Sequence, residues 1–182
     1  MELVKPSVDR LESLREALDR GWTSGYADPD RAKQELRDAP AEFVAKLDDR
    51  EGRRPPITLP GGTTVPRLPG FELWMWDGTF CGNINFRWEP GTPRLPPTCL
   101  GHIGYSVVPW QRRRGYATAA LGQMLPVVRE LGLPWVELTT DLDNVASQRV
   151  ILANGGTLVE KFDRPQALGG EPALRFRIPL DL

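Results

Sequence analysis

The stretch YSVVPWQRRRGYATAAL, residues 105–121, decides the fold that we expect for this chain. It opens with a short apolar strand that ends at Val108, passes a turn marked by proline, and enters a helix whose first turn is built from small residues. The first N–H groups of a helix have no partner inside it, so they suit an anion. Gly115 has no Cβ and Ala117 has almost no side chain, which lets a phosphate come close to the backbone.

Three arginines, Arg112, Arg113 and Arg114, stand directly before this glycine. Guanidinium groups make charge-assisted, often bidentate, contacts with phosphate oxygens, but a run of arginines also fits a solvated surface or part of a nucleic-acid patch. The chain as a whole has a net charge of −1, from 23 basic and 24 acidic residues. We therefore expect no nucleic-acid partner and interpret the arginines as part of a phosphate site.

Length and composition indicate one globular domain of 182 residues, of which 40% are apolar. No run of about 18 apolar residues exists that could cross a membrane. Cys81 and Cys99 are not spaced like metal ligands and His102 is the single histidine, so we expect no metal site. No signal-peptide pattern opens the chain. These features predict a soluble, cytoplasmic protein with reduced thiols.

The order of apolar runs and turn residues predicts alternating strands and helices. In the first half we expect a strand at 2–5, helices at 8–20 and 30–49 with a break at Pro40, and a proline-rich connection at 52–70 with a short strand at 57–59. In the second half we expect strands at 71–76 and 79–88 joined by an Asp77-Gly78 turn, a strand at 100–108, a helix after Gly115, a strand at 135–140, a helix to Ala153, and strands at 157–162 and 173–180. A right-handed helical crossover makes the strands at 100–108 and 135–140 parallel, and open α/β sheets bind ligands at such strand ends.

A second motif, Asn144-Val145-Ala146-Ser147, follows the strand at 135–140 and opens a helix. By itself Asn144 is an ordinary helix N-cap and Ser147 an ordinary first-turn residue. Both motifs together, in this order and at this spacing, resemble the GNAT superfamily of N-acetyltransferases, whose acetyl-coenzyme A signature is similar to Arg-x-x-Gly-x-Ala at residues 112–117. The resemblance is specific over residues 71–180 and holds only in outline for the N-terminal helices.

The resemblance implies a single α/β domain over residues 1–182. Its mixed sheet would be mostly antiparallel, with two central parallel strands that splay apart, and helices within 8–49 would cover the sheet on the acceptor side. Acetyl-CoA would be the cosubstrate, and the residues that the resemblance assigns to it are Val107, Val108, Arg112, Arg113, Arg114, Gly115, Tyr116, Ala117, Thr118, Asn144 and Ser147.

The resemblance also implies catalytic roles. The N–H of Val107 or Val108 would polarise the thioester carbonyl, since Pro109 has no N–H. Many family members protonate the departing thiolate with a tyrosine at the position of Ile151 here, so the usual acid is absent and water or Ser147 would serve. His102 occupies the place where some members carry a glutamate base, and an imidazole with a pKa near ~6.5 can accept a proton. The alternatives are a histidine hydrogen-bonded inside the sheet, with water, Glu137 or Glu72 as the base.

The implied reaction is direct transfer of an acetyl group from acetyl-CoA to a primary amine in a ternary complex. The acceptor is a small molecule or a protein amine, and a homodimer is compatible with the resemblance. A P-loop and a Gly-x-Gly-x-x-Gly fingerprint are both missing from the sequence. The alternative function is a non-catalytic coenzyme A-binding or regulatory module on the same fold, because a fold does not determine a function.

Overall fold

The structure of the protein is a computed structural model that describes residues 1–23, 28–59 and 62–180. In chain order its first elements are β1 (Glu2–Val4), η1 (Val8–Arg10), α1 (Leu11–Asp19), α2 (Pro29–Asp38), α3 (Pro40–Ala45), β2 (Asp48–Asp49), β3 (Ile57–Thr58), β4 (Thr64–Val65), β5 (Gly70–Trp76) and β6 (Phe80–Arg87). The second half contains β7 (Ile103–Val107), η2 (Pro109–Gln111), α4 (Tyr116–Arg129), β8 (Trp135–Asp141), α5 (Val145–Ala153), β9 (Thr157–Asp163), η3 (Gln166–Leu168) and β10 (Pro172–Pro179). Residues 24–27, 60–61 and 181–182, which belong to the predicted domain 1–182, lie outside the described residues.

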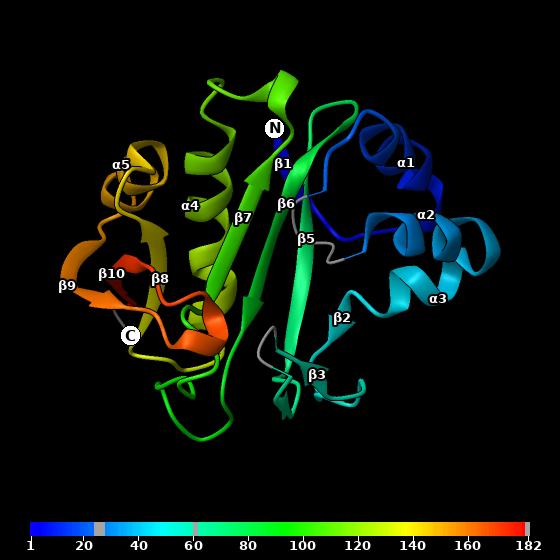
Figure 1. The fold of residues 1–182 in the computed structure, drawn as a ribbon. Helices are drawn as coiled ribbons and strands as arrows, with labels where there is room; N and C mark the ends of the chain where they lie inside the picture. The colour runs from blue at the N-terminus through cyan, green and yellow to red at the C-terminus, as the bar shows by residue number, and fades with distance from the viewer. Residues whose placement is uncertain (24–27, 60–61, 181–182) are drawn as a thin grey trace.

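The predicted α/β class with a mostly antiparallel sheet and flanking helices is confirmed. One sheet has the strand order β1-β5-β6-β7 with β2 also paired to β5, and a second has the order β8-β10-β9, all pairs being antiparallel. No ladder joins β7 to β8 within the described residues. Figure 1 shows these two strands pointing the same way and diverging toward their C-terminal ends, so the predicted pair of splayed parallel strands is present.

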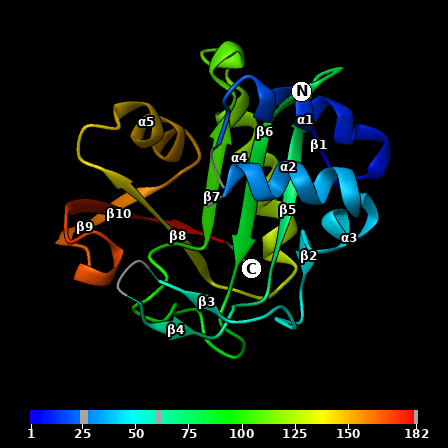
Figure 2. The same cartoon turned by 45° about the vertical axis from the view of Figure 1, so that its right-hand side comes forward.

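Helices cover the sheets on both faces, as Figures 1 and 2 show. α4 and α5 lie on one face, where the apolar stripe of α4 packs on the strands; its buried members are Tyr116, Ala120, Leu121, Met124 and Val128. α1, α2 and α3 lie on the other face, and their buried side chains pack against Trp74, Phe80 and Val108. None of the helices among the described residues is both long and apolar enough to cross a membrane.

Of two local predictions in the first half of the chain, one is corrected and one is confirmed. The helical segment expected at 30–49 is divided at Pro40, which begins α3 at its first position because proline lacks an N–H, and the segment ends in β2 rather than in a helix. The short strand expected at 57–59 is present as β3 and pairs with β4.

Glycine at position 82 lets β6 and β7 approach closely beside the opening. Gly82 pairs with Val107 and has φ of +147°, and a Cβ there would lie 2.1 Å from the Ser106 carbonyl oxygen. No residue other than glycine fits this position without moving the backbone.

The closed end of the divergence is held by His102, which precedes β7 instead of lying inside the predicted strand 100–108. The His102 N–H donates to the Glu137 carbonyl over 2.7 Å, and the Glu137 N–H donates back to Nδ1 of the imidazole over 3.0 Å. The ring is fully buried, stacks on Phe86 and meets Trp135 edge-on. The imidazole thus takes the place of a backbone acceptor and joins β7 to β8 at one point.

The prediction that His102 has an ordinary pKa is wrong. Burial lowers the pKa of His102 to about 4, against the opposing influence of the Glu137 carboxylate, because the charged ring is excluded from water. The neutral ring is therefore the folded form at physiological pH, and it is enclosed rather than open to a substrate. These contacts support a structural histidine.

We expect His102→Ala to lower the free energy of unfolding by about 3 kcal/mol, because it leaves a cavity and an unpaired Glu137 N–H. His102→Asn should cost less, since its side-chain oxygen can still accept that hydrogen bond. As the pH falls, His102 is protonated in the unfolded chain near pH ~6.5 but in the folded protein only near pH 4. The free energy of unfolding therefore decreases over this pH range, by about 3 kcal/mol in all. Chemical denaturation between pH 4 and pH 7 checks this: the native protein should gain stability over His102→Asn as the pH rises, and parallel curves would contradict a buried neutral ring.

Candidate active site

The candidate site lies where β7 and β8 diverge, between the first turns of α4 and α5. β7 ends at Val107 and the chain reaches α4 through η2, while β8 ends at Asp141 and the chain reaches α5 after a short turn. Tyr105 of β7 bridges the two sides, because its hydroxyl lies 2.8 Å from Ser147 Oγ and donates to the Ser147 carbonyl over 3.3 Å. The divergence therefore brings the two sequence motifs to one place.

The start of α4 is an uncapped helix start preceded by left-handed residues, and we call this concave loop the cradle. Gly115 is the N-cap with φ of +76°, and Arg113 has φ of +63°, which is unusual for a residue with a side chain. No side chain caps this helix, so the N–H groups of its first turn, residues 116–118, are not used by a cap. A Cβ at Gly115 would meet no atom of the described residues within 4 Å. Left-handed residues on either side of Arg114, just before an open helix start, create a concave set of donors.

The three arginines of this loop are not equivalent. Arg114 donates to Gln111 and reaches Asp77 at 3.5 Å, and its guanidinium lies over the Tyr116 ring. The buried Tyr116 donates its hydroxyl to Asp77 as well, and this hydrogen bond is the main reason that the pKa of Asp77 is lowered. Arg114 and Tyr116 thus brace the loop on the β5–β6 hairpin. Tyr116 can offer a phosphate only its backbone N–H, and the Arg114 side chain, which the resemblance assigns to the cosubstrate, is engaged by Gln111 and Asp77.

Arg112 and Arg113 are exposed at the same loop. Arg112 donates from Nε to the Val107 carbonyl over 3.2 Å, which ties the loop to the end of β7. Their guanidinium groups therefore stand beside the cradle, where they can add charge for an anion.

Of the two N–H groups predicted to face the oxyanion, that of Val108 is already engaged, so this part of the prediction is wrong. Its N–H donates to the Cys81 carbonyl over 3.0 Å, and its side chain is fully buried. Successive N–H groups of a strand point to opposite edges, so the N–H of Val107 faces β8 and the opening. The N–H of Val107 is therefore the remaining candidate for the oxyanion donor.

The start of α5 has the predicted cap. The Asn144 side chain accepts a hydrogen bond from the Ser147 N–H over 3.0 Å, which is the ordinary role of an N-cap. Ile151 is fully buried in the core, and a Cβ at Gly156 would lie 2.4 Å from its side chain. A tyrosine does not fit at position 151 without rearrangement. The sequence did not identify Tyr105 as a site residue. Its alternation along the strand, which puts the side chain on the α4 and α5 face, could have indicated it.

The opposite face of the sheet, under α1 to α3, carries an acid with a shifted pKa. Burial raises the pKa of Glu72 to about 7, although hydrogen bonds from Trp74 Nε1 (2.9 Å) and Asn83 Nδ2 (3.0 Å) favour its ionised form. Asn83 pairs across the strands with Ser106, whose hydroxyl accepts from Trp22 Nε1 over 3.2 Å. This polar row runs from β5 to the edge of the opening.

Glu137, the other predicted acid, is engaged elsewhere. Its carboxylate accepts from Arg177 over 2.7 Å and lies 3.9 Å from Arg175, and the residue is 8% exposed. No group of three or more histidine, cysteine or acidic side chains that could hold a metal ion occurs in the part of the chain that the structure describes.

Comparison with known proteins places this geometry among acetyltransferases. A family model described as an acetyltransferase (GNAT) domain matches residues 26–157. A search of curated proteins finds no match. The microcin C7 self-immunity acetyltransferase MccE, solved with acetyl-CoA and AMP, superposes with a TM-score of 0.60 and 13% identity over 97% of this chain and 91% of that one.

Two further solved structures have the same architecture. A mutant of the spermidine N-acetyltransferase SpeG from Vibrio cholerae gives a TM-score of 0.60 at 10% identity, over 99% of this chain and 95% of that one. The putative acetyltransferase yncA from Salmonella typhimurium, with its cofactor acetyl-CoA, gives 0.56 at 14% identity, over 99% and 94%. At these identities the likeness shows a common fold.

We expect Gly115→Val to weaken acetyl-CoA binding about tenfold or more, because a branched side chain would fill the cradle and φ is positive. The matched control is Gly132→Val at the other end of α4, where φ is +73° and a Cβ likewise meets nothing within 4 Å. Both changes carry similar backbone strain, so isothermal calorimetry should separate them. Equal affinities of the two folded variants would refute the cradle.

Proposed function

We propose, since the chain belongs to the GNAT acetyltransferase family, that it transfers the acetyl group of acetyl-CoA to a primary amine by direct attack in a ternary complex. The observation that carries this proposal is the uncapped start of α4, with Gly115 and Arg113 both left-handed, directly beside the diverging ends of β7 and β8. A pyrophosphate and an extended thiol arm fit that combination. We take residues 1–182 as one catalytic domain, and its free thiols Cys81 and Cys99 suit a cytoplasmic location.

In this proposal the cosubstrate lies on the α4 and α5 face. The pyrophosphate is held by the N–H groups of 116–118, including those of Ala117 and Thr118, with Arg112 and Arg113 adding charge. The pantetheine arm then follows the opening past Asn144 and Ser147. The thioester carbonyl accepts from the Val107 N–H, which also stabilises the oxyanion when the amine attacks. A C–N bond forms, the C–S bond breaks, and the thiolate leaves.

The amine must be neutral to attack, although in water its pKa is roughly 10. We assign Glu72 as the proton acceptor in place of His102, since it lies on the acceptor face and its pKa is raised to about 7. Two strand spacings, about 10 Å, separate β5 from β7, so water must carry the proton between the amine and this carboxylate.

The thiolate must be protonated on the other face. We propose Tyr105 as the proton donor, with Ser147 fixing its hydroxyl at 2.8 Å. Burial raises the pKa of Tyr105, so the hydroxyl stays protonated at neutral pH and remains able to donate. This tyrosine reaches the opening from β7 and so would replace the acid that Ile151 cannot supply.

The second candidate function is a coenzyme A-binding module without turnover, which the buried Ile151 favours. The two are separated by a turnover assay in which acetyl-CoA is mixed with a panel of primary amines and peptides, and release of the free thiol and the acetylated product are both quantified. We expect thiol release that depends on the amine. Tight acetyl-CoA binding with no acetylated product from any acceptor would favour the binding module.

Replacing Tyr105 by Phe should lower kcat by roughly 10²-fold and leave acetyl-CoA affinity unchanged, because only the proton donor is lost. Ser147→Ala should have a smaller effect, since it removes the partner that positions the hydroxyl. Steady-state kinetics with calorimetry on both variants would test this. If Tyr105→Phe kept the native kcat, Tyr105 would not be the proton donor, and water would protonate the thiolate.

A further inference from the structure

We propose that Arg87, supported by Arg54, forms an anion subsite on the acceptor face, and hence that the acceptor amine carries a carboxylate or phosphate group. This inference rests on the proposed acetyl transfer and specifies its substrate class. It starts from an arginine that the fold leaves without a counter-ion.

Arg87 ends β6 on the face covered by α1 to α3. One terminal nitrogen, Nη2, donates to Asn85 Oδ1 over 2.9 Å, and Nε is buried without a hydrogen-bond partner. No carboxylate forms an ion pair with Arg87 among the described residues. Arg177 of β10, by contrast, has Glu137 at 2.7 Å. Removing a guanidinium from water without an anionic partner is unfavourable. An anionic group that arrives with a ligand would therefore be bound strongly here.

A glycine makes room for this guanidinium. Arg87 Nη2 lies 3.0 Å from the position that a Cβ of Gly104 would take, and Asn85 Oδ1 lies 3.2 Å from it. Any side chain at position 104 would displace the arginine. The guanidinium therefore lies over β7, three residues before Val107, which is about 10 Å along the strand.

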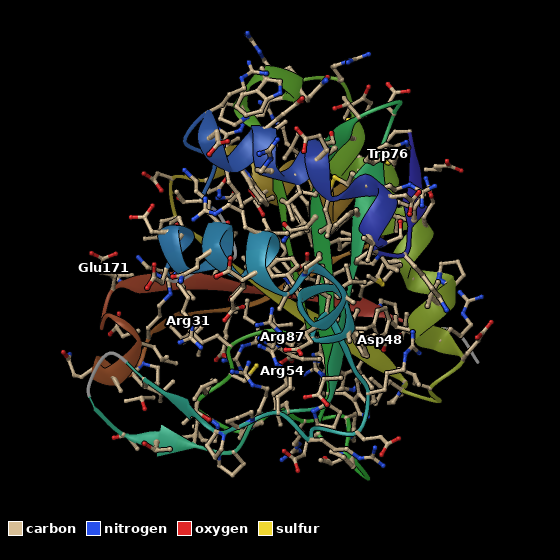
Figure 3. All side chains as sticks on the ribbon, turned by 90° about the vertical axis from the view of Figure 1, so that its right-hand side faces the viewer. Arg31, Asp48, Arg54, Trp76, Arg87 and Glu171 are labelled. Atoms are coloured by element: carbon tan, nitrogen blue, oxygen red, sulfur yellow. The ribbon has the colours of Figure 1, made fainter. Side chains whose placement is uncertain are left out.

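Arg54 adds a second positive charge to the same region. Its Nη1 donates to the Lys46 carbonyl over 3.0 Å, and it too lacks an ion pair within the described ranges. Burial raises the pKa of Glu72, and the charge of Arg54 partly opposes that rise, so the two groups are near each other. Glu72 pairs across the strands with Asn85, the partner of Arg87. Figure 3 draws Arg54 and Arg87 in the space between the α2–α3 pair and the β3–β4 hairpin, with Arg31 on the lower side of α2.

The carboxyl groups of Glu72 and Asp49, which lie in this region, do not neutralise the two arginines. Both oxygens of Glu72 already accept hydrogen bonds, from Trp74 and Asn83. Its raised pKa of about 7 leaves it only partly ionised at neutral pH. Asp49 accepts a hydrogen bond from the Arg54 N–H over 3.1 Å, but it also interacts with a third arginine, Arg67. The region therefore keeps a net positive charge, which attracts an anionic group.

The geometry also sets a length for the acceptor. The amine must reach a carbonyl held at Val107, and the anion must reach a guanidinium about 10 Å away. With contacts of about 3 Å at each end, the amine nitrogen and the anion lie about 4 Å apart if both contacts run along the strand and about 10 Å apart if both run across it. An α-amino acid is too short, whereas an amine that carries its anionic group four to six bonds away fits.

The test compares ω-amino acids from glycine to 6-aminohexanoate, and ω-aminoalkyl phosphates, with alkylamines of the same carbon number. For the native protein we expect kcat/KM to be about tenfold or more higher for the anionic acceptors of four to six carbons. The carboxylate and phosphate series show which anion is preferred. Equal kcat/KM for anionic acceptors and alkylamines at every length would overturn the subsite.

Variants assign the effect to the arginines. Arg87→Gln should raise KM for 6-aminohexanoate about tenfold and leave the alkylamine unchanged, while Arg87→Lys should keep part of the preference. Arg54→Gln should act in the same direction, and its control is the exposed neighbour Arg53→Gln, which should behave as the native protein. Thermal unfolding and acetyl-CoA affinity show that each variant is folded. If folded Arg87→Gln kept the preference for anionic acceptors, the assignment to Arg87 would be refuted. If the native protein bound acetyl-CoA but acetylated no amine, the proposed acetyl transfer would be overturned, and this inference with it.

Discussion

The paired hydrogen bonds between His102 and Glu137 are the constraint on which the functional architecture depends. Two parallel strands that were paired along their whole length would use up every N–H and C=O at their shared edge. Here the backbone and imidazole of one residue join the strands at a single level, and above that level the edges are free to separate. The Val107 N–H and the open start of α4 are exposed to a ligand because the joint is so short.

The two faces of the sheet have different chemistry, and the core explains why both are stable. On the α4 and α5 face a continuous apolar cluster surrounds Ile84 and Leu138. On the α1 to α3 face the apolar contacts around Trp74 lie next to an acid with a raised pKa, Glu72, and to Arg87, which has no ion pair among the described residues. A fold selected for stability alone would not retain those charges, since replacing them with apolar groups is often neutral or stabilising. Their presence fits a binding surface.

The sequence predicted the features that arise from local chemistry. Alternating apolar residues, the Asp77-Gly78 turn and the Gly115 helix start identified the strands, the hairpin and the cradle, because each depends on neighbours along the chain. The Val108 N–H could not be assigned, because its engagement by Cys81 is set by pairing with another strand. The same reason applies to His102, whose burial follows from where β8 lies, and to Arg114, whose partner is the tip of a distant hairpin. Register and long-range packing are not encoded in residue spacing.

In the proposed reaction the two ligands approach the diverging ends of β7 and β8 from opposite faces of the sheet. Coenzyme A would enter over α4 and the amine beneath α2 and α3. Each ligand then has its own route, and neither has to wait for the other to depart. Such an arrangement suits a kinetic scheme in which the order of arrival is free and the spent thiol can be exchanged while the acetylated product is still in place.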